Sequence, residues 1–547
     1  MTAATADRPN VLFITTDQQR YDTLGVTGNR MVRTPNLDAL AARGTLFTRG
    51  CIQGTVCIPS RASLMTGRYV HQHGVSYMEP VIGTTPGLPP WEVTVQERLR
   101  AAGYATAAHG KIHQLPPRGW DETQLTMGKG ARWTVSEGSP LGPSQLGPVY
   151  AEWLEQKRPG AYEQIYEQRR RPEYRERATA IVNVLAADEY VDCWIGENTW
   201  NYLERPETGH GSGSGGGGSA KPFFLWCGFC GPHGPFDPPE PYASMYDPAK
   251  IPLPPLLRAR QKNVPGEDTR KGRFDRDDGE DLVRTIIAYY WGMMTFIDDM
   301  MGRIMDVMTR RGLWDNTLVI FTTDHGEMLG DFGRGGKGNF TEPVIRPPYI
   351  VVPPGSRPNP DGKPREAHGQ IEHIDLVPTI LDYAGLPQPR ELPGISLRPA
   401  LETDTGAAAI GKPAVLSDDV SGDQKTRRKC LRTERFKYVL TTDNRALAQQ
   451  ERRASGGGSS HPFVELYDLQ KDPHELVNVA GESAYRDEVQ RHAELLLQRL
   501  FETERNAWNS GGSLAAQPEE RDHFGRLLRD VPELRGAREM REVAAVG

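Results

Sequence analysis

Two pairs of polar residues stand directly after short apolar, β-branched runs, and together they could bind a divalent metal ion. The pairs are Asp17-Gln18 and Asp324-His325. Each pair offers a carboxylate oxygen followed by a second donor, at the end of a strand, where open α/β sheets place their ligands. Such a site would activate a nucleophile and neutralise an anionic substrate. Taken singly, either pair is more simply a cap at the end of a strand.

A cysteine run supplies the candidate nucleophile. Residues 57–61 read C-I-P-S-R, and residues 66–69 continue the pattern as T-G-R-Y. The stretch resembles the signature of the type I sulfatases of the alkaline phosphatase superfamily, in which the cysteine of C-x-P-S-R is oxidised to formylglycine (3-oxoalanine). In a shorter match, Cys57 would more simply be a buried structural residue ahead of a helix. The extension through residues 66–69 favours the catalytic interpretation.

Formylglycine solves a chemical problem that a thiol does not. A thiolate that attacked sulfur would leave a sulfated thiol with no easy exit, whereas a hydrated aldehyde carries two hydroxyl groups on one carbon. One hydroxyl attacks, and the other then loses its proton, so that sulfate is expelled and the aldehyde returns. The resemblance therefore implies a small anionic sulfate ester as substrate and a formylglycine-generating enzyme as maturation partner.

The resemblance also implies one divalent metal ion, Ca²⁺ or Mn²⁺. Its ligands would be Asp17, Gln18, Asp324, His325 and, through an oxygen after conversion, Cys57. Many members of the family have aspartate at the position of Gln18 and asparagine at that of His325. The variants in this sequence look more like phosphonate monoester hydrolases and choline-sulfatase relatives, and an imidazole ligand shifts the preference from calcium toward manganese. We expect hydrolysis of aryl or small alkyl sulfate monoesters; a phosphonate monoester or phosphodiester hydrolase with the same site is the alternative.

Further residues match catalytic elements of the same family. Lys111 and His113 stand in a G-K-x-H run, where the lysine neutralises the formylglycine oxygen or the substrate and the histidine is the general base that releases sulfate. His233 resembles the histidine that faces the scissile ester oxygen, as general acid or sulfuryl donor. Lys337 resembles the lysine that contacts the sulfate and the ester oxygen. Arg61, one turn after the cysteine, would hold the nucleophile's oxygen by a charge-assisted bond.

The match around this second lysine is longer and continues elsewhere in the chain. It reads K-x4-E-x3-R-x-P through Glu342 and Arg346, with Thr341 where an aromatic residue is usual. Further matches lie in residues 375–381, 394–397 and 465–480. The resemblance implies an alkaline-phosphatase-like fold, in which a large α/β domain with a mainly parallel central sheet precedes a small α+β domain with an antiparallel sheet. Fold alone does not give function, so the site residues carry the argument.

Composition limits these expectations. The 547 residues exceed what one hydrophobic core usually supports, so we expect two domains. A net charge of −6 argues against nucleic acid as the main partner. We find neither a signal peptide nor an apolar run of membrane-spanning length, and six cysteines in so long a chain do not make a disulfide framework. These observations predict a cytoplasmic protein without a membrane partner.

The expected elements place the candidate residues in a layered domain. Strands are predicted over residues 10–17, 222–227 and 317–323, and helices over 34–44 and about 281–311. Strands that alternate with helices predict an α/β domain around a mainly parallel sheet, which we assign to residues 1–405. Within it, residues 133–204 are interpreted as a helical insertion, either a lid over the site or an inert solvated addition.

The remaining part of the chain, residues 406–547, is expected to form the small α+β domain. Strands are predicted over 435–440 and 465–469, and an amphipathic helix over about 484–508. The charged tail from residue 517 is a possible contact to another subunit of a homo-oligomer. Two Gly/Ser tracts, 211–219 and 456–460, are typical of flexible loops.

Several motifs are better explained by structure than by chemistry. Cys227 and Cys230 have C-x-x-C spacing, but no second pair follows, so an unmodified non-catalytic or thiol-redox protein is a remote alternative. His109 falls outside the G-K-x-H run and is expected to be structural. The runs Arg169-Arg170-Arg171 and Asp298-Asp299 are each expected to lie on a solvated helix face.

Overall fold

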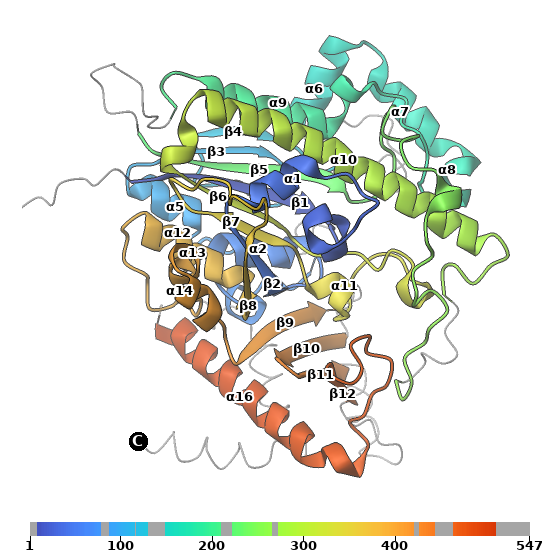
Figure 1. Ribbon diagram of the computed structural model, residues 1–547, viewed down its shortest axis with the longest axis vertical. Helices are drawn as coiled ribbons and strands as arrows, with labels where there is room; N and C mark the ends of the chain where they lie inside the picture. Colours follow the sequence, from blue (N-terminus) through green and yellow to red (C-terminus); the bar gives the residue numbers. More distant parts are fainter. Residues whose placement is uncertain are drawn as a thin grey trace, which may run out of the picture.

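Eight strands form the large sheet, in the order β4-β3-β5-β1-β6-β7-β2-β8 (Figure 1). The computed structural model describes residues 8–77, 87–114, 116–129, 148–208, 221–264, 272–420, 426–443 and 463–509. The strands are β1 (Asn10–Asp17), β2 (Thr45–Cys51), β3 (Ala105–Gly110), β4 (Glu122–Leu125), β5 (Phe223–Pro232), β6 (Thr317–Thr323), β7 (Tyr349–Val352) and β8 (Arg365–Glu372). Only β7 runs antiparallel to its neighbours among these described strands, which confirms the predicted mainly parallel sheet.

The centre of this sheet brings the two candidate aspartates together. Every residue of β1 and β6 is buried, as expected for parallel strands that helices cover on both faces. The two strands pair in register from Asn10 with Thr317 to Thr16 with Thr323. Because both strands end at the same edge of the sheet, Asp17 and Asp324 follow side by side, although they are 307 positions apart in the chain.

Helices cover both faces of the large sheet (Figure 1). One face packs against α1 (Pro35–Ala41), α9 (Val191–Glu204) and α10 (Gly279–Arg310). The other face packs against α2 (Cys57–Thr66), α5 (Val95–Ala101), α12 (Leu376–Tyr383), α13 (Arg398–Glu402) and α14 (Asp404–Ala409). The other α-helices among the described residues of this part are α3 (Val70–His73), α6 (Pro148–Lys157), α7 (Ala161–Arg170), α8 (Pro172–Glu176) and α11 (Glu342–Ile345).

Asp298 of α10 faces the interior, whereas the sequence predicts it on a solvated helix face. Asp298 is fully buried, whereas Asp299 is exposed. The Asp298 carboxylate accepts hydrogen bonds from the main-chain N–H groups of Asn36 at 3.1 Å and Leu37 at 2.7 Å, at the start of α1. Burial raises the pKa of Asp298 to about 7. The predicted solvated face is therefore wrong for Asp298, which instead satisfies the free N–H groups of a neighbouring helix.

The small sheet follows the large one in the chain. It is antiparallel, in the order β12-β11-β10-β9, with β9 (Ala414–Val420), β10 (Thr426–Thr433), β11 (Phe436–Asp443) and β12 (Phe463–Asp468). The amphipathic helix α16 (Arg486–Asn509) packs on it through Val489, Leu496, Leu497 and Leu500. This confirms the predicted small antiparallel unit. The tail from residue 517 and both Gly/Ser tracts lie outside the described residues. Across the described residues, no helix combines the length and apolar character needed to span a bilayer.

Candidate active site

Four buried side chains meet at the carboxyl end of the central strands. Asp17 ends β1, Asp324 and His325 follow β6, and Cys57 begins α2. One ligand atom from each of these four side chains lies within 4.8 Å of those from the other three. The structure therefore brings together four of the five residues predicted as metal ligands, and they come from three distant parts of the chain.

Cys57 reaches this group as the first residue of a helix that is buried on all sides. All ten residues of α2 are buried, and the N-terminal end of a helix favours negative charge. The Cys57 Sγ atom lies 2.8 Å from Lys337 Nζ and 3.3 Å from His325 Nε2. Burial and the nearby Asp17 carboxylate raise the pKa of the thiol above its ordinary value of 9.0. An unmodified Cys57 is therefore mostly protonated at neutral pH and a poor nucleophile.

Arg61 joins the two carboxylates of the site. Its Nε donates to Asp324 Oδ2 at 2.8 Å, and its Nη2 donates to Asp17 Oδ2 at 3.2 Å. Its other N–H groups donate to the Thr15 hydroxyl at 3.4 Å and to the main-chain carbonyls of Thr16 at 3.3 Å and Lys111 at 2.6 Å. These bonds use all five donors of the guanidinium. Beside an unmodified Cys57, Arg61 thus fixes the carboxylates of the candidate metal site.

Gln18, the fifth predicted ligand, presents an amide oxygen that lacks a partner. Its Nε2 donates to the Glu327 carboxylate, while its Oε1 is buried without a hydrogen-bond partner among the described residues. Its backbone is left-handed, with φ of 67°, and the Tyr290 hydroxyl donates to its carbonyl at 2.6 Å. A buried amide oxygen left unsatisfied costs about 1–3 kcal/mol. A bound cation would satisfy it.

Sequence reasoning missed the two residues that orient this glutamine. Glu327 accepts from Gln18 and from the main-chain N–H of Leu329 at 3.1 Å, so its carboxylate is fixed from two directions. It stands two residues after His325, and extending the strand-end motif to D-H-G-E would have found it. Tyr290 lies within the long α10, where an aromatic residue at helical spacing gives no separate signal.

Two lysines supply positive charge beside residue 57. Lys111 Nζ lies 2.6 Å from Asp17 Oδ2, and Lys337 Nζ lies 2.9 Å from His325 Nε2. Burial lowers the pKa of Lys111, but attraction to the Asp17 carboxylate more than offsets it, so that its pKa lies above the ordinary value. Lys111 is thus charged at neutral pH. The structure places both predicted lysines at the group.

The two candidate histidines are held as neutral rings with opposite tautomers. His113 Nε2 lies 3.0 Å from the Met127 carbonyl, and His233 Nδ1 lies 2.5 Å from the Gly234 carbonyl. A carbonyl only accepts, so these nitrogens carry the proton. The lone pairs lie on His113 Nδ1, which is buried without a hydrogen-bond partner among the described residues, and on His233 Nε2, 3.9 Å from Asp17 Oδ1. Burial, with nearby ammonium groups, holds the pKa of both rings well below the ordinary value. His113 thus suits a base, whereas His233 must gain a proton before acting as an acid.

The donor set fits a divalent ion. Burial lowers the pKa of His325 to about 4, so its ring is neutral, and its Nδ1 donates to the Gly326 carbonyl at 2.9 Å. This leaves the Nε2 lone pair directed at the group, as is usual for a metal-binding histidine. Burial raises the pKa of Asp17, but the Lys111, Lys337 and Arg61 cations more than offset it. The pKa ends well below its ordinary value, so this carboxylate is ionised. Together with the free oxygen of Gln18, these residues would hold a hard or borderline dication.

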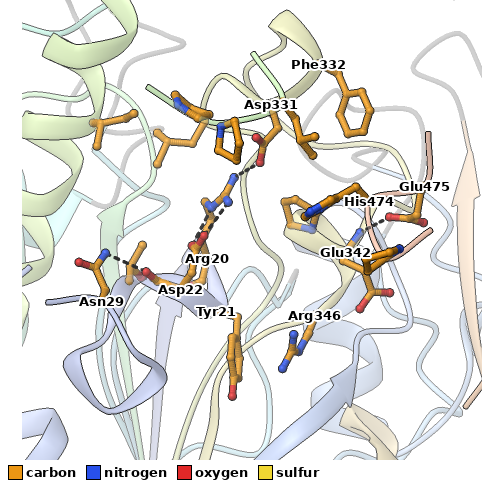
Figure 2. A pocket seen from close by; sticks show the side chains of 18 of the residues that line it. Arg20, Tyr21, Asp22, Asn29, Asp331, Phe332, Glu342, Arg346, His474 and Glu475 are labelled. Carbon is orange, nitrogen blue, oxygen red and sulfur yellow. Dashed lines mark hydrogen bonds and ion pairs between the residues drawn. The ribbon is translucent and has the colours of Figure 1, made fainter. Parts of the chain in front are cut away.

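Two further residues of the lysine motif, Glu342 and Arg346, lie outside this group. They line a separate cavity of about 640 Å³, between the large and small sheets (Figure 2). Glu342 lies 2.9 Å from both Arg432 Nε and Lys437 Nζ of the small sheet. The Arg346 guanidinium lies 3.9 Å over the ring of Tyr21. The described lining of this cavity includes none of the predicted catalytic or metal residues, so Glu342 and Arg346 lie apart from the candidate active site.

A smaller cavity of about 250 Å³ has Lys337 of the candidate site in its lining. Its walls come from the loop around this lysine and from strands of the small sheet. The charged and tyrosine side chains of its lining are Arg334, Lys337, Arg428, Lys437, Glu465, Tyr467 and Glu475. The cavity is thus polar, and strands of the small sheet form part of its wall.

The remaining motifs have structural roles. His109 is buried beside Thr199 and Tyr202, and burial lowers its pKa to about 4. Cys227 and Cys230 are free and buried on β5. Burial raises the pKa of Cys227 to about 12 and that of Cys230 further, which makes both poor redox thiols.

Known proteins share the fold and the family of this chain. The solved structure of a phosphonate monoester hydrolase of Agrobacterium radiobacter matches with a TM-score of 0.68 and 26% identity, over 90% of this chain and 96% of that chain. The fold is therefore the alkaline-phosphatase-like fold that the sequence predicts. The family model described as Sulfatase matches residues 9–127 and 165–386, more than half of the chain. The chain belongs to the sulfatase family and is a sulfuric ester hydrolase by class.

Two relatives span nearly the whole chain. An arylsulfatase of Clostridium perfringens (strain 13 / Type A) is 28% identical over 509 residues, which cover 90% of this chain and 94% of that protein. The multifunctional alkaline phosphatase superfamily protein PehA of Trinickia caryophylli is 29% identical over 536 residues, which cover 91% of this chain and 96% of that protein. The family resemblance stated from the motifs is thus confirmed.

Proposed function

We propose that this protein hydrolyses sulfate monoesters of phenols or small alcohols, with a formylglycine made from Cys57 and one divalent ion, Ca²⁺ or Mn²⁺. The observation that carries the proposal is the position of Cys57 Sγ. It lies among the candidate metal ligands and 2.8 Å from Lys337 Nζ, where an oxygen of the converted residue would stand. A formylglycine-generating enzyme would be the maturation partner.

The metal and the modified residue would supply distinct chemistry. Asp17, Gln18, Asp324 and His325 would hold the ion, which stabilises negative charge on the group being transferred. The hydrated aldehyde supplies one hydroxyl as nucleophile and a second whose deprotonation frees the sulfate. The protein contributes the fixed orientation of the carboxylates through Arg61, and of the Gln18 amide through Glu327.

The charges around the site suit a small anion. The cations Arg61, Lys111 and Lys337 surround the carboxylates Asp17 and Asp324, which leaves a positive excess even before a dication binds. Preorganised charges of this kind stabilise a developing negative charge without further rearrangement. The two lysines would bind the sulfuryl oxygens, and Lys337 also stands close enough to residue 57 to reach the ester oxygen.

The histidines would divide the proton transfers. His113 Nδ1 carries a lone pair and would take the proton whose loss releases sulfate. His233 Nε2 would deliver a proton to the departing alcohol after gaining one in the complex with substrate. The alcohol part of the substrate would enter the cavity of about 250 Å³ beside Lys337, which favours a small leaving group.

A second candidate function uses the same residues. A phosphonate monoester or phosphodiester hydrolase is supported by the amide of Gln18 and the imidazole of His325 in the metal site. It is also supported by similarity to the phosphonate monoester hydrolase of Agrobacterium radiobacter. Kinetics on nitrophenyl sulfate and nitrophenyl phenylphosphonate, measured side by side, separate the two. A phosphonate kcat/KM far above the sulfate value would make phosphonate hydrolysis the favoured function.

The test of the mechanism is Cys57→Ala in protein produced together with a formylglycine-generating enzyme. We expect turnover to disappear while circular dichroism stays unchanged. The matched control is Cys430→Ala, a buried cysteine of the small sheet, which should keep its activity. Mass spectrometry of the peptide across residue 57 should show a lighter species that reacts with an aldehyde-specific tag. Ordinary activity in Cys57→Ala would refute the mechanism.

A further inference from the structure

A buried arginine of the insertion lies between two loops, of which one contacts His113 and the other carries His233. The sequence predicts Arg169, near the end of α7, on a solvated helix face with Arg170 and Arg171. For Arg169 this is wrong: its side chain is 4% exposed, whereas Arg170 is exposed. Removing a guanidinium from water is unfavourable unless close partners compensate. Its partners therefore indicate why it is there.

Arg169 donates to acceptors on two separate loops. Its Nη1 donates to the Lys129 carbonyl at 2.7 Å, and its Nη2 donates to Asp237 Oδ2 at 3.2 Å. Asp237 also accepts from Asn183 Nδ2 and from the Tyr190 hydroxyl, both at 2.9 Å. Three side chains of the insertion thus donate to the Asp237 carboxylate. Of these three, Arg169 is the one that also donates a hydrogen bond to the loop of Lys129.

The first loop, residues 126–129, contacts His113. The carbonyl that orients this histidine belongs to Met127, two residues before Lys129. The same segment is anchored at its start, where Thr126 N–H donates to the Gly110 carbonyl at 3.0 Å. The segment is therefore fixed by β3 on one side of Met127 and by Arg169 on the other. Loss of the second anchor would let the carbonyl shift, and the ring of His113 with it.

The second loop carries His233 and ends at Asp237. Lys129 Nζ donates to the Pro235 carbonyl at 2.9 Å, so Lys129 joins the two loops directly. The insertion also bonds the main chain of this loop, where Ile181 N–H donates to the Phe236 carbonyl at 3.2 Å. Arg169 holds the carbonyl of the lysine and the carboxylate at the end of the loop. One side chain therefore constrains both histidine segments.

We propose that Arg169 is a positioning residue that sets the orientation of His113 and His233 together. The insertion then holds two loops of the active site in place and is not an inert addition. The inference rests on the proposed function for the roles of the two histidines, but not for the contacts themselves. Arginine suits this task because its planar fork reaches two acceptors with fixed geometry, which an ammonium does not reproduce.

The first test follows the loops without any activity measurement. Hydrogen–deuterium exchange of the purified protein should be at least about tenfold faster in Arg169→Ala, in both residues 126–129 and residues 233–237. Arg170→Ala is the matched control, because Arg170 is the neighbouring arginine, exposed and stacked on Tyr166 at 5.2 Å. It should leave both segments unchanged.

The second test follows catalysis. Arg169→Ala should lower kcat roughly 10- to 100-fold, as expected when catalytic groups move by about 1 Å, with a smaller change in KM. The loss should be larger on phenyl sulfate than on nitrophenyl sulfate, since only the poorer leaving group needs the proton from His233. Arg169→Lys should be intermediate, and it becomes the variant measured if Arg169→Ala does not fold.

The outcomes separate this inference from the proposed function. Faster exchange in both segments supports it, even if the wild-type protein hydrolyses no sulfate ester. Exchange equal to that of Arg170→Ala, or a change in one segment only, overturns it. In an active enzyme, a loss of equal size on good and poor leaving groups overturns the link from Arg169 to His233.

Discussion

Replacing Arg61 with alanine should destabilise the metal-free protein by about 3–5 kcal/mol, the usual range for breaking a buried ion pair. Asp17 and Asp324 have fully buried side chains, and both bond the Arg61 guanidinium. Without Arg61, Asp17 keeps Lys111 at 2.6 Å. Asp324 keeps hydrogen bonds from the main-chain N–H groups of Gln18 at 3.1 Å and His325 at 2.9 Å, but no longer the guanidinium.

The size of the effect follows from the bonds that are lost. Two of the five join the guanidinium to a carboxylate, at roughly 1.5–3 kcal/mol each, so together they give about 3–6 kcal/mol. The three bonds to neutral oxygens add to this, while relaxation and water entry reduce the sum. Arg100 provides the contrast, because its ion pair with Asp121 at 2.7 Å joins side chains that are about half exposed. Arg100→Ala should cost less than about 1 kcal/mol.

The assay is urea unfolding in the presence of a chelator, followed by tryptophan fluorescence and circular dichroism. Arg61→Lys, which keeps the charge but has three donors, should lie between Arg61→Ala and the wild type. It is also the variant to measure if Arg61→Ala does not fold. A free energy of unfolding for Arg61→Ala within about 1 kcal/mol of the wild type would refute the bracing role.

Three more outcomes follow from the histidines. In His113→Ala, the first bond should still break and the cycle then stall, which stopped-flow should detect as a burst of about one equivalent of nitrophenol per site; steady turnover without a burst would contradict this. His233→Ala should lose more activity on phenyl sulfate than on nitrophenyl sulfate, and equal losses would pass the acid role to Lys337. Buried His109 has a pKa of about 4 against an ordinary 6.5, so its neutral form stabilises the fold above pH 6.5, and this contribution is lost as the pH falls through 4. Urea unfolding of His109→Gln at pH 7, 5 and 4 should show up to roughly 3 kcal/mol less acid destabilisation than the wild type.

The sequence predicts the candidate metal ligands because the ends of buried strands can be recognised from its apolar runs. Apolar runs that end in Asp17 and Asp324 identify two buried parallel strands, and such strands end at one edge of the sheet. Their common edge needs only the α/β class, whereas the pairing that joins residues 307 positions apart comes from the strand order of the structure. The motif also predicts that Cys57 lies at the start of a helix, as the structure shows.

The direction of individual side chains was not predictable in the same way. Arg61 lies one helical turn after Cys57, so the spacing suggests that it faces the same oxygen. Its donors instead meet acceptors of β1 and β6, and those positions depend on how α2 packs on the sheet. Two charged residues were predicted on solvated helix faces, and both predictions are wrong. Asp298 and Arg169 have polar spacing on their helices, but each is buried against a partner more than 60 positions away.

The overall positive charge of the site does not decide between sulfate and phosphonate. A sulfate monoester and a phosphonate monoester are both tetrahedral monoanions, so Arg61, Lys111, Lys337 and a dication attract them alike. They differ in that a carbon substituent of the phosphonate takes the place of one sulfate oxygen. A cation aimed at that position would favour sulfate, because an apolar group there would remove its partner. Selectivity is thus set by which groups surround the transferred atom on the side of the third oxygen. The paired measurement on nitrophenyl sulfate and nitrophenyl phenylphosphonate tests this directly, since the leaving group is the same in both.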